Sequence, residues 1–275
     1  MDTDLFYFDS KVWDIGTIFE LLTPYINNGD VIYLQVDLMR FGKLISGVNK
    51  QQLLNNYVKL FDDLVGKNGT IIVPTYSYSW GKDSSNFIFD VVNTPSKLGI
   101  FSEFYRNKYL SLRTMDPMFS QVIKGKSARE IVQTLENDSF GSKSVFSSMH
   151  GFNAKLISFG TSGYDPTFVH YAEQYYHENI GELDYRFLKK FIGNVMDYSG
   201  KKHRSSQYCF SRNLDKYTDF LFNDKKLRDD LFFRNKLNEI RVGNGIVGIA
   251  DANSVFDAIQ IGLSKDMHYF LTTNR

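Results

Sequence analysis

The chain has 275 residues, of which 43% are hydrophobic and 16% aromatic. This composition excludes a disordered protein, because disordered segments lack the apolar area that offsets chain entropy. The formal net charge is +1 at pH 7, without the clustered basic excess that a phosphate backbone requires, so we expect no nucleic-acid partner. A single cysteine, Cys209, excludes an intramolecular disulfide and a cysteine-rich zinc site.

The first residues are acidic and lack the basic region and apolar core of a signal peptide. No stretch reaches the roughly 18 to 20 apolar residues that cross a bilayer. We therefore expect a cytoplasmic protein with no membrane partner.

The first third of the chain is typical of a β-α-β unit. Residues 15–27 carry apolar side chains at helical spacing and end in a turn rich in Asn and Gly. A β-branched run predicts a buried strand over 31–36, an amphipathic stripe predicts a helix over 53–64, and a second apolar run predicts a strand over 70–73. Two strands joined through a helix indicate parallel pairing.

The middle of the chain continues this alternation. Residues 77–95 have no clear period and predict a long loop. Ser127 and Glu130 have the spacing of a capping box, with Ser127 as the N-cap. The further elements expected are a helix over 99–109, a strand over 122–124, a helix over 127–135, a strand over 154–159 and a helix over 167–177.

The pattern changes after residue 180. Two strand-like runs flank Asp197-Tyr-Ser-Gly200 and predict an antiparallel hairpin over 191–210. Helices over 225–239 and 252–263 and short strands over 240–242 and 245–249 follow. The fold class we expect is α/β, with a central, mostly parallel sheet flanked by helices and a hairpin-containing α+β subdomain in the C-terminal half.

One helix carries the residues best suited to chemistry. His170, Glu173 and His177 share a face because they are three, four or seven positions apart. A carboxylate beside an imidazole orients the ring and selects its tautomer, as a general base requires. From the residues alone, a solvated surface pair and a metal site built from all three side chains stay open, although the spacing differs from HExxH.

Several segments in the same order are similar to the aminoglycoside 3-N-acetyltransferase family, over residues 29–213. Gly69-Thr-Ile-Ile-Val-Pro-Thr-Tyr76 resembles its Gly-Thr-Leu-hydrophobic-Pro-Thr-Phe/Tyr element. Arg113-Thr-Met-Asp-Pro-Met-Phe-Ser120 resembles Arg-Ser-x-His-Pro-x-x-Ser, and Thr167-Phe-Val-His-Tyr-Ala-Glu173 resembles Thr-Phe-Leu-His-x-x-Glu. Further matches lie at Pro95–Arg106, Phe140–Ser144 and Tyr185-Arg186.

The resemblance implies acetyl transfer from acetyl-CoA to an amine of a small amino-sugar acceptor, without a metal. It implies that His170 deprotonates the amine and that Glu173 orients His170. The residues it suggests for the coenzyme are Val36, Asp37, Leu38, Thr75, Thr114, Pro117 and Ser120, and those for the acceptor are Tyr76, Asp116 and Tyr185. Residues 1–180 would then be the acetyl-CoA-binding catalytic core, and residues 181–275 would complete the core and the acceptor site. The resemblance also suggests a homodimer.

The chain departs from the family pattern at three positions. Gln35 replaces a His, Val36 replaces a Ser, and Asp116 replaces the His before Pro117. The near-neutral charge and a basic hairpin favour a nucleotide-linked or glycan amino sugar over a polycationic antibiotic. Two alternatives are a homologue that binds coenzyme or sugar without turnover, and a metal-dependent hydrolase that uses His170, Glu173 and His177.

Overall fold

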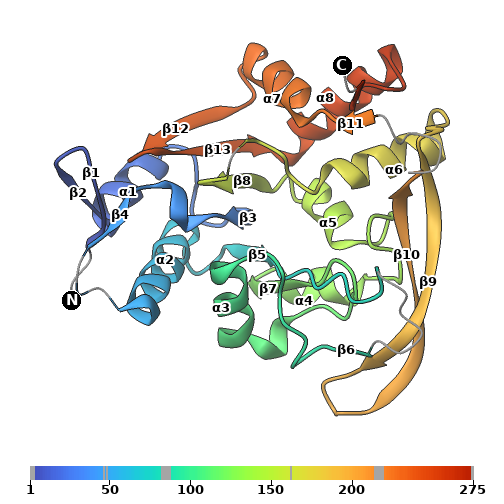
Figure 1. Cartoon of the computed structure of the whole chain (residues 1–275), viewed down its shortest axis with the longest axis horizontal. Coiled ribbons are helices and arrows are strands. Elements are labelled where there is room, and N and C mark those ends of the chain that lie inside the picture. Colours follow the sequence, from blue (N-terminus) through green and yellow to red (C-terminus); the bar gives the residue numbers. More distant parts are fainter. Residues whose placement is uncertain are drawn as a thin grey trace.

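A six-stranded sheet in the order β12-β13-β8-β3-β5-β7 forms the centre of the protein in this computed structural model (Figure 1). The structure describes residues 4–45, 47, 49–81, 88–161, 163–213 and 220–273. The strands of the sheet are β3 (Val31–Val36), β5 (Thr70–Pro74), β7 (Gln121–Gly125), β8 (Lys155–Phe159), β12 (Asn238–Val242) and β13 (Gly245–Asp251).

The predicted parallel pairing holds only at the centre of this sheet. Strand β3 runs parallel to β5 and to β8, whereas β7, β13 and β12 each join by antiparallel pairing. The sheet is therefore mixed. Strands β12 and β13 lie within 181–275, so the C-terminal segment completes the sheet through the register Val247↔Phe159.

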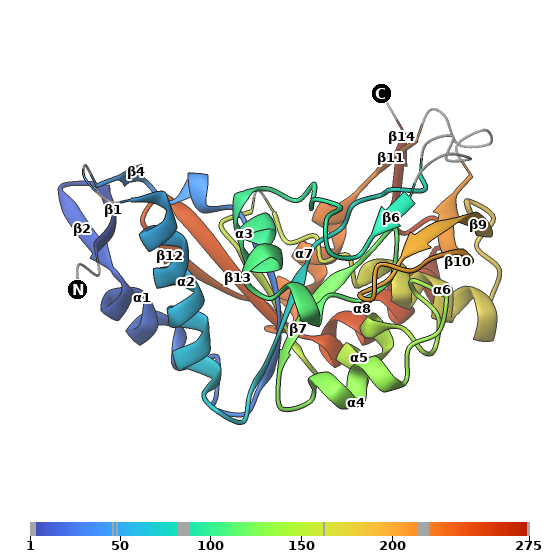
Figure 2. The same ribbon diagram turned by 90° about the horizontal axis from the view of Figure 1, so that it is seen from below.

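Alternating side chains of the central strands supply two separate cores, because successive residues of a strand point to opposite faces. Ile32 and Leu34 pack with α1 (Ile15–Leu22), α2 (Lys50–Val65) and α3 (Ile100–Lys108). Val31 and Tyr33 pack on the other face, against the helices α4 (Ala128–Gln133), α5 (Val145–Gly151), α6 (Val169–Asn179), α7 (Asp224–Phe233) and α8 (Ala252–Lys265). Figure 2 shows α1 and α2 on the opposite side of the molecule from α4, α5, α6 and α8.

Three smaller sheets surround the central one. The long strands β9 (Arg186–Met196) and β10 (Lys202–Arg212) form the predicted antiparallel hairpin, and β6 (Ile88–Asp90) pairs with β9. The other two sheets consist of β1 (Asp4–Phe8), β2 (Lys11–Asp14) and β4 (Lys43–Leu44), and of β11 (Phe220–Phe222) and β14 (Leu271–Thr273). Within the described residues, the remaining elements are the short 3₁₀ turns η1 (Leu38–Arg40) and η2 (Leu110–Leu112).

Several sequence predictions need correction. The segment 77–95 was expected to be a loop, but its described part contains β6; residues 82–87 lie outside the described residues. Ser127 is the N-cap residue of α4 as predicted, but the capping box is wrong because the Ser127 side chain makes no capping bond. The Ser127 backbone N–H donates to Thr70 Oγ1 over 2.9 Å. The N-terminal sheet and α5 were not predicted, and α1 and α7 end earlier than expected, at Leu22 and Phe233.

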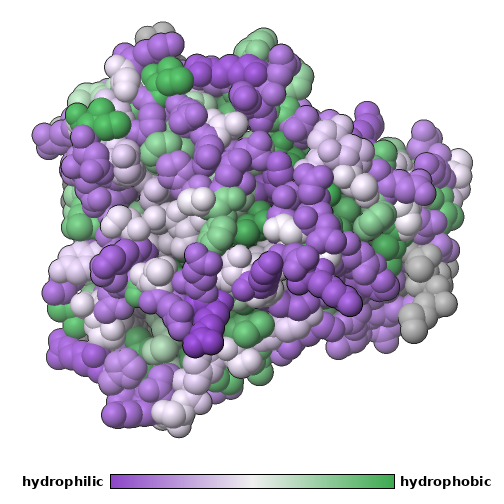
Figure 3. All heavy atoms as spheres, turned by 180° about the vertical axis from the view of Figure 1, so that it is seen from behind, coloured by the Kyte–Doolittle hydropathy of each residue, from purple (hydrophilic) through white to green (hydrophobic). Residues whose placement is uncertain are grey.

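The surface carries no dominant apolar feature on the face seen in Figure 3. Hydrophilic residues cover most of that face, with apolar residues scattered among them. Among the described residues, no helix is both long enough and apolar enough to span a membrane.

Candidate active site

Polar side chains gather along one edge of the central sheet. The carboxyl ends of β3, β5 and β8 meet there, and the start of β7 joins them because Gln121 pairs with Pro74. In open α/β sheets, ligands bind at this edge, where strands give way to loops and helix starts. The helix α6 begins ten residues after the end of β8 (Phe159 to Val169), and this places His170 near the same edge.

His170 and Glu173 form the predicted pair. The His170 Nδ1 atom lies 3.0 Å from Glu173 Oε2, the imidazole side chain is 23% exposed and the Glu173 side chain is 0% exposed. The spacing of three residues on α6 explains the contact. The burial of Glu173 excludes the solvated surface pair that the sequence left open.

Two further residues donate hydrogen bonds to the Glu173 carboxylate, and the sequence predicts this role for neither of them. Arg186 Nη2 donates to Glu173 Oε2 over 2.6 Å, and the Tyr185 hydroxyl donates to Glu173 Oε1 over 2.8 Å. Tyr185 had been predicted to contact the acceptor, but it is only 2% exposed, so its ring is not available to stack on a sugar. The adjacent Tyr-Arg motif is the only sequence signal that pointed to this part of the chain.

The electrostatics keep Glu173 ionised and His170 neutral. Burial works to raise the pKa of Glu173, but the positive charge of Arg186 and the hydrogen bond to His170 outweigh it, so the pKa is lowered. Burial, together with the charge of Arg186, lowers the pKa of His170 against the opposing effect of Glu173. A neutral imidazole that donates from Nδ1 to Glu173 carries its acceptor electron pair on Nε2, which is the form a general base needs.

Arg186 also approaches the imidazole itself. Its Nη2 lies 3.0 Å from His170 Nδ1. A guanidinium only donates, so this contact competes with donation from Nδ1 to Glu173, and the two cannot be made by one tautomer. We assign a proton to His170 Nδ1 and infer that Nδ1 donates a hydrogen bond to Glu173, because that bond satisfies an ionised, fully buried carboxylate.

His177 does not join this group. Its Nδ1 accepts a hydrogen bond from the Leu183 backbone N–H over 3.0 Å, and its ring packs 5.1 Å from that of Phe210. Within the described part of the chain, no three His, Cys, Asp or Glu side chains are grouped so as to hold a metal ion.

The first group of predicted coenzyme residues lines a cavity of about 570 Å³ at the ends of β3 and β5. Val36, Asp37 and Leu38 line it on one side, and Gly99, Ile100 and Ser102 at the start of α3 also line it. Gly99 precedes α3 with φ at 93°, a left-handed conformation that suits glycine. The first N–H groups of α3 receive no side-chain cap from it, and free N–H groups at a helix start attract phosphate.

The second group of predicted coenzyme residues makes hydrogen bonds within the protein. Thr75 and Ser120 are fully buried and exchange side-chain-to-carbonyl bonds of 3.0 and 2.9 Å. Arg113 donates to Ser120 Oγ and to the Thr75 carbonyl. Thr114 Oγ1 accepts from the Gln121 N–H, and the Pro117 carbonyl accepts from Ser77. These hydroxyls and carbonyls brace the loop before β7.

The other two predicted acceptor residues lie in different surroundings. Tyr76 is 1% exposed, and its hydroxyl lies 2.7 Å from that of Tyr33 in the core. Asp116 lines a second cavity, of about 390 Å³, between the loop before β7, the α4–α5 segment and β10. Burial raises the pKa of Asp116. The structure therefore places Asp116 at a cavity and Tyr76 inside the core.

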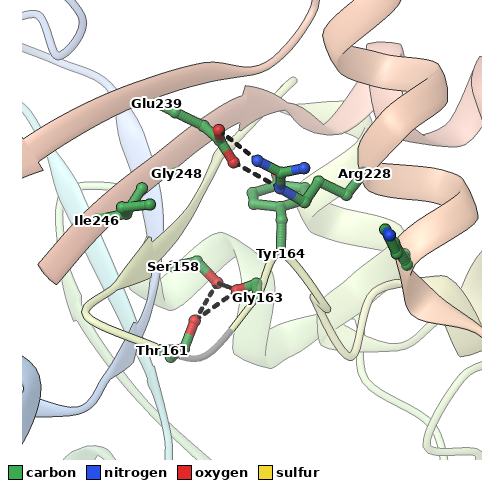
Figure 4. Close-up of a pocket in the computed structure, with 9 residues that line it drawn as sticks. Ser158, Thr161, Gly163, Tyr164, Arg228, Glu239, Ile246 and Gly248 are labelled. Carbon is green, nitrogen blue, oxygen red and sulfur yellow. Dashed lines mark hydrogen bonds and ion pairs between the residues drawn. The ribbon is translucent and has the colours of Figure 1, made fainter.

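A third cavity, of about 350 Å³, lies beyond the end of β8 (Figure 4). Arg228 and Glu239 close one side of it through two bonds of 2.7 and 2.6 Å. Thr161 donates to Ser158 and to the Gly163 carbonyl on the other side. Thr161 also lines the cavity at the ends of β3 and β5, so the two cavities adjoin.

Comparisons with known proteins show the family and the fold of the chain. A sequence model of the aminoglycoside 3-N-acetyltransferase family matches residues 34–263. Among curated proteins, none matches the chain.

Several solved structures share the fold. AAC-IIIb in a binary complex with CoASH is 17% identical with a TM-score of 0.73, covering 95% of this chain and 98% of that one. AAC-VIa with bound sisomicin is 19% identical with a TM-score of 0.72, covering 92% and 98%. The YokD protein from Bacillus subtilis is 17% identical with a TM-score of 0.67, covering 90% and 97%.

Proposed function

Because the chain belongs to the aminoglycoside 3-N-acetyltransferase family, a family of N-acetyltransferases, we propose that it transfers the acetyl group of acetyl-CoA to an amine of an amino sugar with His170 as the general base. The observation that carries this proposal is the buried arrangement of His170, Glu173 and Arg186. This arrangement favours the neutral form of the His170 imidazole and orients its ring. His170 ends the segment Thr167-Phe-Val-His170, which resembles the family motif.

The chemistry requires such a base, because a protonated amine has no electron pair with which to attack a thioester. His170 Nε2 accepts a proton from the acceptor amine, and the amine nitrogen forms a C–N bond to the thioester carbon. The C–S bond breaks, and CoA leaves as a thiolate that takes up a proton. The imidazolium formed on His170 is stabilised by the ionised Glu173. Arg186 and Tyr185 keep that carboxylate in place throughout. A base of this kind contributes about 10²- to 10⁴-fold to the rate.

We propose that the cavity at the ends of β3 and β5 holds the coenzyme. Acetyl-CoA supplies an activated acyl group and carries phosphates that suit the uncapped start of α3. The structural relative AAC-IIIb, whose complex contains CoASH, supports the same donor for this chain. Val36, Asp37 and Leu38 are the residues we propose to hold it, whereas Thr75, Thr114, Pro117 and Ser120 support the loop beside it.

The acceptor we propose is a small amino sugar whose amine reaches His170. The relative AAC-VIa with bound sisomicin supports an aminated sugar, and Asp116 supplies a carboxylate for it. A nucleotide-linked or glycan amino sugar stays a prediction that rests on the basic residues of the β9–β10 hairpin. A cytoplasmic location and a homodimer also stay predictions.

The test is a thiol-release assay with acetyl-CoA and a panel of amino sugars, nucleotide-linked amino sugars and aminoglycosides. We expect release with at least one acceptor, and loss of release in His170→Ala. His177→Ala is the matched control, since His177 lies on the same helix outside the Glu173 contact. Coenzyme binding without transfer to any acceptor would favour the binding homologue, and an absence of coenzyme binding would overturn the proposal.

A further inference from the structure

The β9–β10 hairpin carries a strong excess of positive charge. Residues 186–212 contain seven Lys or Arg and one acidic residue, Asp197, so the hairpin has a net charge of +6 within a chain whose total is +1. Figure 1 shows its two long strands along one side of the molecule. The near-neutral total therefore hides a basic surface, and charges of one sign gathered on one surface attract a ligand of the opposite sign.

The hairpin has an inner and an outer face, because successive side chains of a strand point to opposite sides. On the inner face, Val195 and Cys209 are buried in a small core, and Gly193 lies against Trp80. The outer face is made by the alternate positions, and its exposed members are Leu188, Lys190, Ile192, Lys202 and Arg204. Three of these five side chains are cations.

The cations of the outer face are not neutralised by the protein. No ion pair of Lys190, Lys202 or Arg204 occurs among the described residues. The Lys190 amine lies over the ring of Tyr208, 5.4 Å from its centroid, and this contact leaves the positive charge in place. Like charges on one surface repel one another, so an anionic ligand here would remove an unfavourable interaction.

The one acidic residue of the hairpin is occupied by its own turn. The Asp197 carboxylate accepts from the Ser199 N–H and hydroxyl over 2.9 and 2.6 Å, and from the Lys201 N–H over 3.0 Å. These bonds shape the turn and keep the carboxylate away from the cations of the strands. The outer face is therefore available to an anion from outside the chain.

The cations are spread along the hairpin. Lys190 stands opposite Tyr208, whereas Lys202 stands opposite Met196, six residues further along β9. These two levels are about 20 Å apart at about 3.3 Å per strand residue. A phosphate or carboxylate accepts from a cation over about 2.8 Å, so one anionic group cannot meet both amines. The spacing favours a long ligand with repeated anionic groups over a small anion.

Two other kinds of polyanion suit this face less well. Proteins that bind single-stranded nucleic acid stack bases on exposed rings, but the ring of Tyr208 is half-buried beneath Lys190. Elements that lie on a membrane bury a continuous apolar face, but Leu188 and Ile192 flank a cation here. The tip offers no apolar anchor either, since the Tyr198 hydroxyl donates to backbone carbonyls of the protein.

The hairpin also borders the place where the acceptor is proposed to bind. Gln207 of the inner face and Tyr198 of the turn line the 390 Å³ cavity that contains Asp116. Tyr198 is 43% exposed, and Lys201 and Lys202 follow it closely in the chain. The turn therefore joins the cavity to the cations of the outer face.

We propose that the outer face of the hairpin binds an anionic glycan, with acidic groups repeated along it, and so presents an amino sugar of that glycan to the cavity. The cations hold the acidic groups, and Leu188 and Ile192 pack on the C–H faces of the sugar rings. The inference rests on the proposed function for the role of the glycan as acceptor, whereas its binding rests on the charge pattern alone.

The binding experiment is calorimetry of the full chain, without acetyl-CoA, with oligogalacturonates of increasing length. Neutral dextran oligomers are the control ligand. We expect affinity to rise with the length of the oligogalacturonate and to fall with added salt, and dextran not to bind. The variant Lys190→Gln/Lys202→Gln/Arg204→Gln should bind the longest oligomer at least about tenfold more weakly, the scale of losing three charged contacts.

The matched control is Lys11→Gln/Lys43→Gln/Lys67→Gln, which removes the same charge from exposed positions on β2, on β4 and after α2. Figure 1 shows β2 and β4 on the opposite side of the molecule from the hairpin. We expect the control to bind within about twofold of the unmodified chain, because charges beyond about 10 Å are screened. Lys190→Arg/Lys202→Arg keeps the charge and should keep the affinity.

Several results would overturn the glycan surface. One is equal binding by the hairpin variant and its matched control, and another is an affinity that does not depend on oligomer length. Tighter binding to single-stranded DNA, or to phosphatidylglycerol vesicles, than to the oligogalacturonate would also overturn it. Should the triple variant fail to fold, judged by its melting temperature, Lys202→Gln/Arg204→Gln replaces it in each comparison.

Acetyl transfer distinguishes the two proposals. The substrate is partly de-N-acetylated hyaluronan, which carries carboxylates and free amines on alternating sugars. We expect the triple variant to raise KM for this polymer by about tenfold with kcat unchanged, and to leave transfer to glucosamine unaltered. Cation-dependent binding without transfer to any acceptor would overturn the proposed function alone. Transfer that requires His170 but has the same KM in the triple variant would overturn the glycan surface alone.

Discussion

Arg186 donates to the Glu173 carboxylate over 2.6 Å in surroundings where the two side chains are only 3% and 0% exposed. The residues are thirteen positions apart, one on α6 and one at the start of β9. A buried carboxylate stays ionised only when a charge and hydrogen bonds compensate for its lost hydration. The role of Glu173 in orienting His170 therefore depends on Arg186.

Glu173→Gln tests this dependence. The amide keeps the shape of the side chain but removes the charge, so the buried guanidinium of Arg186 loses its ion pair with Glu173. We expect the free energy of unfolding to fall by about 3–5 kcal/mol, and kcat for acetyl transfer to fall by about 10- to 100-fold as the ring loses its orienting partner. Denaturant unfolding and steady-state kinetics measure the two effects.

The control for this variant is Glu178→Gln, five residues further along α6, where the carboxylate is exposed and accepts a hydrogen bond from Gln174. We expect it to change stability by less than about 0.5 kcal/mol. Equal behaviour of the two variants would contradict the assigned role of Glu173.

Arg186→Gln tests the pKa of His170. The positive charge of Arg186 adds to burial in lowering that pKa, so removing the charge raises it. His170 acts as a base only when it is deprotonated, and the acidic limb of the kcat/KM profile should therefore move to higher pH. The pH profile is compared with that of Arg234→Gln, an exposed residue at the end of α7. A limb that stays in place or moves to lower pH would rule out the assigned effect.

Asp116→Asn tests the buried carboxyl in the cavity between the loop before β7, the α4–α5 segment and β10. Burial raises the pKa of Asp116, so the folded protein holds this proton to higher pH than the unfolded chain does. The associated stability is present below the unfolded pKa of about 3.9 and is lost as pH rises through the folded pKa. Asn does not titrate. We therefore expect the variant to gain free energy of unfolding relative to the unmodified chain as pH rises, measured by denaturant unfolding at several pH values; a difference that is independent of pH would contradict this.

Gly193→Ala tests the packing of the hairpin on the core. A Cβ atom at this position would lie 2.4 Å from Cε2 of Trp80, which is itself buried. We expect a loss of about 1–3 kcal/mol in the free energy of unfolding, the usual cost of overpacking. Gly151→Ala, where nothing lies within 4 Å of the added atom, is the control and should be nearly neutral. A melting temperature that does not distinguish the two variants would show that the hairpin yields at this contact.

The sequence by itself determined the helices and strands that depend on residues close to one another in the chain. Strands β3, β5 and β8, the helices α2 and α3, and the β9–β10 hairpin follow from hydrophobic period and turn residues. The contact between His170 and Glu173 follows from helical spacing alone, because residues three apart on a helix are neighbours whatever surrounds them.

Only the tertiary structure decided the features that depend on distant partners. The antiparallel placement of β7 and β13, the pairing of β1 with β4 and the surroundings of Asp116 join segments far apart in the sequence, and the Arg186–Glu173 bond joins a helix to a strand of another sheet. Tyr185 shows the reason: its sequence context suited an acceptor contact, but its depth in the core turned its hydroxyl toward Glu173. Burial and long-range pairing depend on how the layers pack, and a local pattern carries no information about which distant side chain fills a given space.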